Sequence, residues 1–388
     1  MVTNEMNKLD QLKTVLLVDD APANIQIVNS ILKDTYKIRI ATNGPKALEL
    51  ANATPRPDLI LLDVMMPEMD GYQVCSQLKL HSQTRDIPVI FLTGQTDVQD
   101  ETRGFEAGAV DYIHKPFSPA VVRARVQTHL VLRGIQEQLA QQLRTIQKEL
   151  ETARQIQMSI LPTEIPKIEG LDIAARYMPM TSVAGDFYDF IVVDERRIGI
   201  LMADVSGHGM PAALIASMLK IALAAQVPHA TDPAQVLSGL NQVLCGKFEH
   251  HHVTAAYLFI DMGKKTMTYA GAGHPPMLFW GPSSPNVQDV AENGLFLGRF
   301  PWATFSSVDL PFTEGDWCLL YTDGIPETAN SSEVEFGENR FRQFLVTERS
   351  TTANQFADLL LEELSIWANR GPGGELDDDI TMVVIRVI

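Results

Sequence analysis

The sequence predicts a multidomain protein that joins a doubly wound α/β domain, a long helical coiled-coil linker and an α+β sandwich. Three observations predict this arrangement. Short apolar runs alternate with amphipathic stretches over residues 14–117, heptad-spaced apolar residues occupy the proline-free stretch 120–161, and short strand-like runs fill residues 167–388. The domains are therefore expected at 14–130, 131–161 and 162–388.

The first domain is predicted from five short apolar runs, TVLLVDD, KIRIA, DLILLDV, IPVIFLTG and DYIHKP. Each run is rich in Val, Ile and Leu and ends in a turn signal, as buried strands do. Helical patterns separate them, for example at 23–34 and 44–53. Strands that alternate with helices form a parallel sheet with helices on both faces, and a ligand site at the carboxyl ends of the strands.

Chemically reactive side chains lie at these strand ends. Asp19 and Asp20 follow the first strand, Asp63 ends the third, Thr93 ends the fourth, and Lys115 ends the fifth. Three carboxylates at one sheet edge repel one another unless a cation lies between them, and Mg²⁺ prefers oxygen ligands. A carboxylate is also able to accept a phosphoryl group, which a nearby hydroxyl and ammonium would stabilise.

The motifs LLVDD, LLDVMMPEMDGY, FLTG and DYIHKP resemble those of the receiver domains of two-component response regulators, over residues 14–130. The resemblance implies that Asp63 is the phosphoacceptor and that Mg²⁺ is bound by Asp19, Asp20, Asp63 and the carbonyl of Met65. It also implies that Thr93 and Lys115 contact the phosphoryl group and that Thr93 and Tyr112 act as the switch. The implied partner is a histidine kinase or a phosphotransfer protein.

The linker is predicted from a seven-residue repeat of apolar side chains. Leu132, Leu139, Ile146, Ala153 and Ile160 recur at this spacing, with Leu143 and Leu150 between them. Such a repeat favours a dimeric coiled coil, so a homodimer is expected. Gln136 and Gln157 interrupt the seam, and a single amphipathic helix packed on a domain is the alternative.

The third domain combines many short strands with few helices. The strand-like runs are IGILMADVSG, AAYLFIDM, MTYAGAGH, DWCLLYTDG and ITMVVIRVI, and helical patterns cover residues 211–226, 233–245 and 353–368. Strands in blocks with a few helices predict an α+β sandwich.

Four groups of aspartates follow or precede these runs, in GDFYD, ADVSGHG, YTDG and LDDDIT. Carboxylate ligands without Cys or His select hard cations such as Mg²⁺ or Mn²⁺. Two such ions would support hydrolysis of a phosphomonoester. Any single Asp-Gly pair is more simply a turn signal, and only the whole set indicates a metal site.

Residues 153–388 resemble the metal-dependent (PPM-type) serine/threonine phosphatases, in the RsbU/SpoIIE-like branch. The matching motifs include ARQIQMSILP, AGDFYDF, ADVSGHGMPAAL, AGAGHPP, YTDGIPET and DDDITMVVI. The resemblance implies two Mn²⁺ or Mg²⁺ ions held by Asp186, Asp204, the carbonyl of Val205, Asp323 and Asp378, with Asp204 bridging the ions. Asp379 is the alternative to Asp378. The phosphate-binding arginine of eukaryotic members has no clear equivalent, and Arg176 is a weak candidate.

Histidines near these motifs allow two interpretations. His250, His251 and His252 lack the spacing of metal ligands and are expected in a solvated loop. His274 either orients its turn or takes part in catalysis.

The composition excludes several classes of function. The chain has 31 Lys and Arg against 48 Asp and Glu, a net charge of −17, which argues against binding to nucleic acid or to an anionic membrane. Three cysteines argue against a disulfide scaffold. The chain has no apolar run near the ~20 residues of a membrane span, and its first residues lack the apolar core of a signal peptide. A cytoplasmic location is expected.

Together these features predict a response regulator in which phosphorylation of Asp63 controls a protein phosphatase through the linker helix. The resemblance implies that the substrate is a phosphorylated STAS-type anti-sigma-factor antagonist in a partner-switching pathway. The alternative is a catalytically silent adaptor that binds a sigma-factor regulator. A transcription regulator is disfavoured because the acidic C-terminal half has no basic helix-turn-helix.

Overall fold

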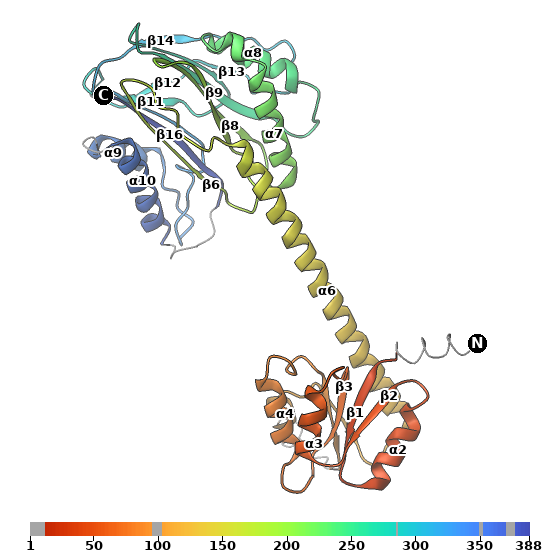
Figure 1. Ribbon diagram of the computed structural model, residues 1–388. Helices are drawn as coiled ribbons and strands as arrows, with labels where there is room; N and C mark the ends of the chain where they lie inside the picture. The colour runs from red at the N-terminus through yellow and green to blue at the C-terminus, as the bar shows by residue number, and fades with distance from the viewer. Residues whose placement is uncertain (1–11, 95–102, 285, 349–351, 370–376) are drawn as a thin grey trace. The chain divides into compact units, whose positions relative to one another are not determined.

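The computed structural model describes residues 12–94, 103–284, 286–348, 352–369 and 377–388. The chain divides into two compact units, Met1–Thr145 and Ile146–Ile388, and each is considered by itself. Figure 1 shows both units and the helix α6 that carries residues of each.

The first unit is built on a parallel five-stranded sheet, as predicted. Its strands are β1 (Thr14–Val18), β2 (Lys37–Ala41), β3 (Leu59–Asp63), β4 (Val89–Thr93) and β5 (Asp111–His114), in the order β2-β1-β3-β4-β5. Its helices include α2 (Pro22–Leu32), α3 (Gly44–Asn52) and α4 (Gly71–Leu80). Side chains alternate along β1: Leu16 belongs to the apolar cluster that includes residues of α3 and α4, and Leu17 to the cluster that includes residues of α2.

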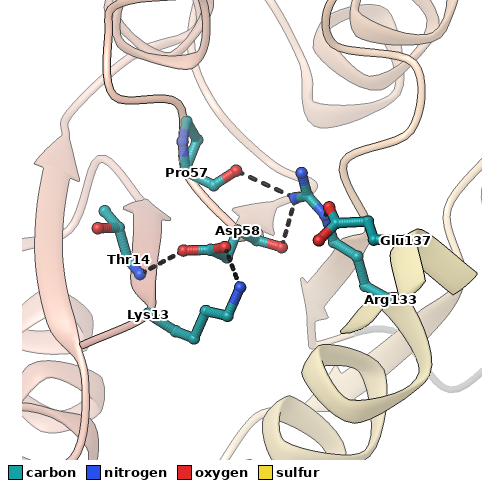
Figure 2. Close-up of polar contacts among 6 residues, drawn as sticks. All are labelled: Lys13, Thr14, Pro57, Asp58, Arg133 and Glu137. Atoms are coloured by element: carbon teal, nitrogen blue, oxygen red, sulfur yellow. Dashed lines mark hydrogen bonds and ion pairs between the residues drawn. The ribbon is translucent and has the colours of Figure 1, made fainter. Parts of the chain in front are cut away.

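The long helix α6 (Pro119–Ile160) confirms the helix that was predicted over the proline-free stretch 120–161. It begins inside the stretch assigned to the first domain, where Val122, Val126 and Leu130 are buried against the sheet. Arg133 then donates hydrogen bonds to the carbonyl oxygens of Pro57 (3.2 Å) and Asp58 (2.8 Å), just before β3 (Figure 2). The first unit therefore holds the first four turns of α6.

Two sheets form the second unit. One contains β7 (Phe187–Asp194), β8 (Arg197–Val205), β9 (Val253–Asp261), β10 (Thr266–Ala272) and β13 (Asn293–Gly294), with β14 (Val308–Pro311) paired to β10. The other has the order β12-β11-β15-β16-β6: β12 (Gln288–Val290), β11 (Met277–Trp280), β15 (Trp317–Tyr321), β16 (Ile380–Val387) and β6 (Leu171–Met178). These are the sheets of a sandwich.

Helices cover the outer faces of both sheets (Figure 1). The helices α7 (Met210–Ala224) and α8 (Pro233–Leu244) pack on the sheet that contains β8. The helices α9 (Glu338–Thr347) and α10 (Ala353–Ala368) pack on the sheet that contains β16. The result is a helix–sheet–sheet–helix sandwich, which confirms the predicted α+β class; the short 3₁₀ turn η1 (Val227–His229) links α7 to α8.

Strand β16 has an almost continuously apolar sequence because both of its faces are buried. Val383 and Ile385 face the core between the sheets, whereas Met382 and Val384 face α9 and α10. A strand buried on both faces loses the polar–apolar alternation of a surface strand. The sequence prediction omitted α9, in which only Phe341 and Leu345 are buried.

In the part of the chain that the structure describes, every helix is too short or too polar to cross a lipid bilayer.

Candidate functional sites

The first site lies at the carboxyl edge of the parallel sheet. Carboxylate oxygens of Asp19, Asp20 and Asp63 lie within 4.8 Å of one another. The Lys115 Nζ donates to Asp63 Oδ2 at 2.8 Å and to Asp19 Oδ2 at 3.1 Å. The structure thus brings together three of the predicted Mg²⁺ ligands and the predicted lysine.

The charges of this cluster suit a divalent cation. Burial and the neighbouring Asp19 carboxylate raise the pKa of Asp63, although Lys115 opposes this effect. Three carboxylates against one ammonium leave net negative charge, and oxygen ligands suit Mg²⁺. The residues present therefore fit the ion that the sequence predicts.

The predicted switch residues lie on β4 and β5. Thr93 ends β4 and is buried. Tyr112 is half-buried; its ring lies 4.9 Å from the His114 ring and 5.4 Å below the Arg125 guanidinium of α6. Arg125 also pairs with Asp111, the first residue of β5. The strand that carries Tyr112 is therefore tied directly to the first turns of α6.

The second site draws carboxylates from both sheets of the sandwich. Asp186 directly precedes β7 and Asp204 lies near the end of β8, in one sheet. Asp323 follows β15 and Asp378 precedes β16, in the other sheet. Although these residues are far apart in sequence, the charge of Asp204 acts on Asp186, and the charges of Asp323 and Asp378 act on Asp204.

Burial and like charge act together on this cluster. Burial and the Asp204 carboxylate raise the pKa of Asp186 well above its usual value. Burial, with the charges of Asp323 and Asp378, raises the pKa of Asp204 to about 7. Among the described residues, none of these four carboxylates forms an ion pair with a basic side chain. Clustered acids without a compensating base fit hard divalent cations.

Asp378 and Asp379 have different surroundings. The Asp379 carboxylate accepts hydrogen bonds from the backbone N–H groups of Met180 (2.7 Å) and Gly185 (2.8 Å) and is buried. Asp378 is exposed. Asp379 therefore anchors the segment before Asp186, which leaves Asp378 as the better candidate ligand.

The loop after Asp204 is held by two residues of the histidine run. The Ser206 carbonyl lies 2.7 Å from His251 Nδ1, and the Ser206 hydroxyl accepts a hydrogen bond from the His252 N–H at 2.9 Å. Both histidines are partly buried. The expectation of a merely solvated loop is wrong for these two, because they pack on the loop that follows Val205.

Two other candidates have structural partners. The Arg176 guanidinium donates to Asp358 and Asn354 of α10, so this arginine holds the outer helix to the sheet. His274 is buried, and its Nδ1 lies 3.0 Å from the Thr254 hydroxyl. Burial lowers the pKa of His274 to about 3, so the ring is neutral.

Gln157 was expected only to interrupt the heptad seam. Gln157, near the end of α6, is buried and forms two hydrogen bonds to the backbone of Ala184. The available signal was a glutamine at a position of the heptad seam that is otherwise apolar, since a polar side chain that becomes buried there needs hydrogen-bond partners.

Comparisons with known proteins agree with the two domains that the sequence predicts. The family model "Stage II sporulation protein E (SpoIIE)" matches residues 194–388, and "Response regulator receiver domain" matches residues 15–127. The phosphoserine phosphatase RsbU of Bacillus subtilis is 33% identical over 266 residues, which cover 67% of this chain and 74% of RsbU. The phosphoserine phosphatase RsbP of the same organism is 34% identical over 47% of this chain and 46% of RsbP.

Among solved structures, the SiaA-PP2C domain of Pseudomonas aeruginosa covers 63% of this chain and 98% of its own, with a TM-score of 0.55 and 21% identity, which supports the fold. The protein is a response regulator in which a receiver domain is joined to a PPM-type phosphatase domain. It belongs to the SpoIIE family.

Proposed function

We propose that the protein hydrolyses phosphoserine or phosphothreonine on a protein substrate, at a two-metal site formed by Asp186, Asp204, the Val205 carbonyl, Asp323 and Asp378. The observation that carries this proposal is that hydrogen bonds join the acidic segments of the two sheets. Thr322, beside Asp323, donates to Asp186 at 2.8 Å, and Gly185, beside Asp186, donates to Asp379 at 2.8 Å. Two divalent ions held there would supply a metal-bound hydroxide and neutralise charge on the phosphoryl group.

The protein residues have distinct roles in this proposal. Thr322 donates a hydrogen bond from its hydroxyl to Asp186 Oδ2 at 2.8 Å and so orients this buried carboxylate. Asp379 holds the preceding segment by its two backbone contacts. The charges of Asp323 and Asp378, from the other sheet, act on Asp204, and in our proposal Asp204 is the residue that the two ions would share.

The receiver unit controls this activity in our proposal. Asp63 accepts a phosphoryl group with Mg²⁺ bound by Asp19, Asp20, Asp63 and the Met65 carbonyl, and the donor is a histidine kinase or phosphotransfer protein. Lys115 already contacts Asp63 and is placed to neutralise the added charge. Strand β5 connects the two regions: Lys115 follows its carboxyl end at the site, and Asp111 at its amino end pairs with Arg125 of α6.

The substrate class follows from the relatives. RsbU and RsbP are both named as phosphoserine phosphatases. Since this chain covers 74% of RsbU, we propose the same class of reaction, on a phosphorylated STAS-type anti-sigma-factor antagonist.

A matched set of variants tests the activity. Purified full chain is assayed on a phosphoserine protein with Mn²⁺, with chelator, and as Asp323→Asn. Asp309→Asn, an exposed aspartate of β14, is the control. We expect metal-dependent turnover that Asp323→Asn loses and Asp309→Asn keeps. Absence of turnover in every sample, with the receiver still phosphorylated, would replace the phosphatase with the binding adaptor.

We also propose that α6 pairs with α6 of a second copy. Leu139, Leu143 and Ile146 are each more than half exposed, on the heptad seam of a helix with no partner there in the described chain. A double substitution Leu139→Glu and Leu143→Glu should convert a dimer to a monomer in light scattering. Gln141→Glu, on the opposite face, should leave the dimer intact. A wild-type monomer at micromolar concentration would refute this pairing.

A further inference from the structure

The last turns of α6 contact the phosphatase site through one buried amide side chain. Gln157 Nε2 donates to the Ala184 carbonyl at 2.7 Å, and the Ala184 N–H donates to Gln157 Oε1 at 3.0 Å. The Gln157 side chain thus satisfies both backbone groups of a fully buried residue, as a neighbouring strand would. The neighbouring glutamine, Gln155, is exposed.

Ala184 begins a short segment that leads directly into the site. Gly185 donates its N–H to Asp379, and Asp186 is the buried candidate ligand. A Cβ at Gly185 would lie 2.7 Å from the Val205 carbonyl oxygen, so this segment packs on the backbone of the other proposed ligands without spare room. A displacement of Ala184 would therefore act on a close-packed segment only two residues before Asp186.

We propose that Gln157 is a positioning residue of the phosphatase site: its amide holds Ala184 and so sets the position of Asp186 against Asp204 and Val205. This inference rests on the proposed phosphatase function and deepens it. Because Gln157 lies on α6, a rotation or axial shift of the helix end changes both of its hydrogen bonds at once. The same amide then makes metal binding depend on the state of the linker.

The test compares Gln157→Met with Gln155→Met in the full chain. Methionine has nearly the shape of glutamine but cannot form either hydrogen bond to Ala184. The same substitution at the exposed Gln155 is the control. Gln157→Glu keeps an acceptor for the Ala184 N–H and removes the donor to the Ala184 carbonyl. Three quantities are measured: hydrogen exchange of residues 180–187, the Mn²⁺ concentration for half-maximal activity, and the KM for the substrate.

For Gln157→Met we expect about tenfold faster exchange of the Ala184 and Gly185 amides, since two buried hydrogen bonds are lost. The half-saturating Mn²⁺ concentration should rise about tenfold, because Asp186 must be repositioned when the ion binds. The KM for substrate should stay within twofold, and saturating Mn²⁺ should restore most of the turnover. Gln157→Glu should show the same changes, and Gln155→Met should match the wild type.

Faster exchange with an unchanged Mn²⁺ requirement would show a contact that only fastens the helix, and would overturn the inference. So would unchanged exchange in Gln157→Met. If the wild type hydrolysed no substrate, the proposed function would fail separately. Mn²⁺-dependent protection of residues 180–187 would then decide: its loss in both Gln157 variants but not in Gln155→Met supports the positioning role, and equal protection in all variants refutes it.

Discussion

Arg133 fastens α6 to the receiver unit, and its removal should loosen the helix measurably. Its Nη1 donates to the carbonyl oxygens of Pro57 and Asp58, at 3.2 and 2.8 Å, and its Nε pairs with Glu137 at 2.7 Å (Figure 2). The Asp58 carboxylate in turn accepts from the Thr14 N–H at 2.7 Å. The arginine is therefore bonded to the segment between α3 and β3, which the Asp58 carboxylate in turn fastens to the first residue of β1.

The expected magnitude follows from these contacts. Hydrogen bonds from a charged donor contribute roughly 1.5–3 kcal/mol, and here one nitrogen serves both carbonyls, one of them at longer distance. The pair with the exposed Glu137 adds a few tenths of a kcal/mol at most. We therefore assign about 2 kcal/mol to Arg133. This is about a 30-fold change in the equilibrium between docked and undocked helix.

Hydrogen exchange of the full chain measures this change directly. In Arg133→Met, amides of residues 127–137 should exchange about 30-fold faster than in the wild type. Arg144→Met is the matched control, because Arg144 lies on the same helix and is exposed. The response of phosphatase activity to beryllofluoride should also weaken in Arg133→Met alone. Equal exchange in the two variants would refute the reasoning.

Three further predictions concern the two sites and the core. Asp63→Asn should abolish labelling by a small acyl-phosphate donor and the response to beryllofluoride; labelling that persists would place the phosphoacceptor elsewhere. Gly185→Ala should destabilise the phosphatase unit by about 1–3 kcal/mol in urea, since its Cβ would meet the Val205 carbonyl at 2.7 Å, whereas the unobstructed Gly134→Ala should not destabilise the chain. The neutral His274 should make the phosphatase unit less stable as the pH falls below 6.5: its folded pKa of about 3 lies below the unfolded value, so only the unfolded chain gains the proton. In the presence of chelator, the free energy of unfolding of the wild type should fall by about 2 kcal/mol more than that of His274→Gln between pH 7 and pH 5. An equal fall in both would show that this histidine is not the cause.

Much of the fold followed from local pattern. The five apolar runs of the first unit became its five strands, because a parallel sheet covered on both faces requires continuous apolar sequence. The end of α6 lies at Ile160, since Pro162 follows closely. Helix α9 was not predicted, because it has only two buried side chains to mark its inner face.

The sequence also identified the acidic residues of both sites, but it could not predict which contacts they make. The sequence by itself determined that Asp63 ends a strand and that Asp204 and Asp323 follow apolar runs, since those features depend on neighbours in the chain. Only the tertiary structure decided that Asp379 bonds Met180 and Gly185 while Asp378 stays exposed, because the choice depends on a segment almost 200 residues away. The contact that Gln157 makes was decided in the same way. Its place on the helix was visible in the heptads, but its partner, Ala184, comes from another element and is brought to it only by folding.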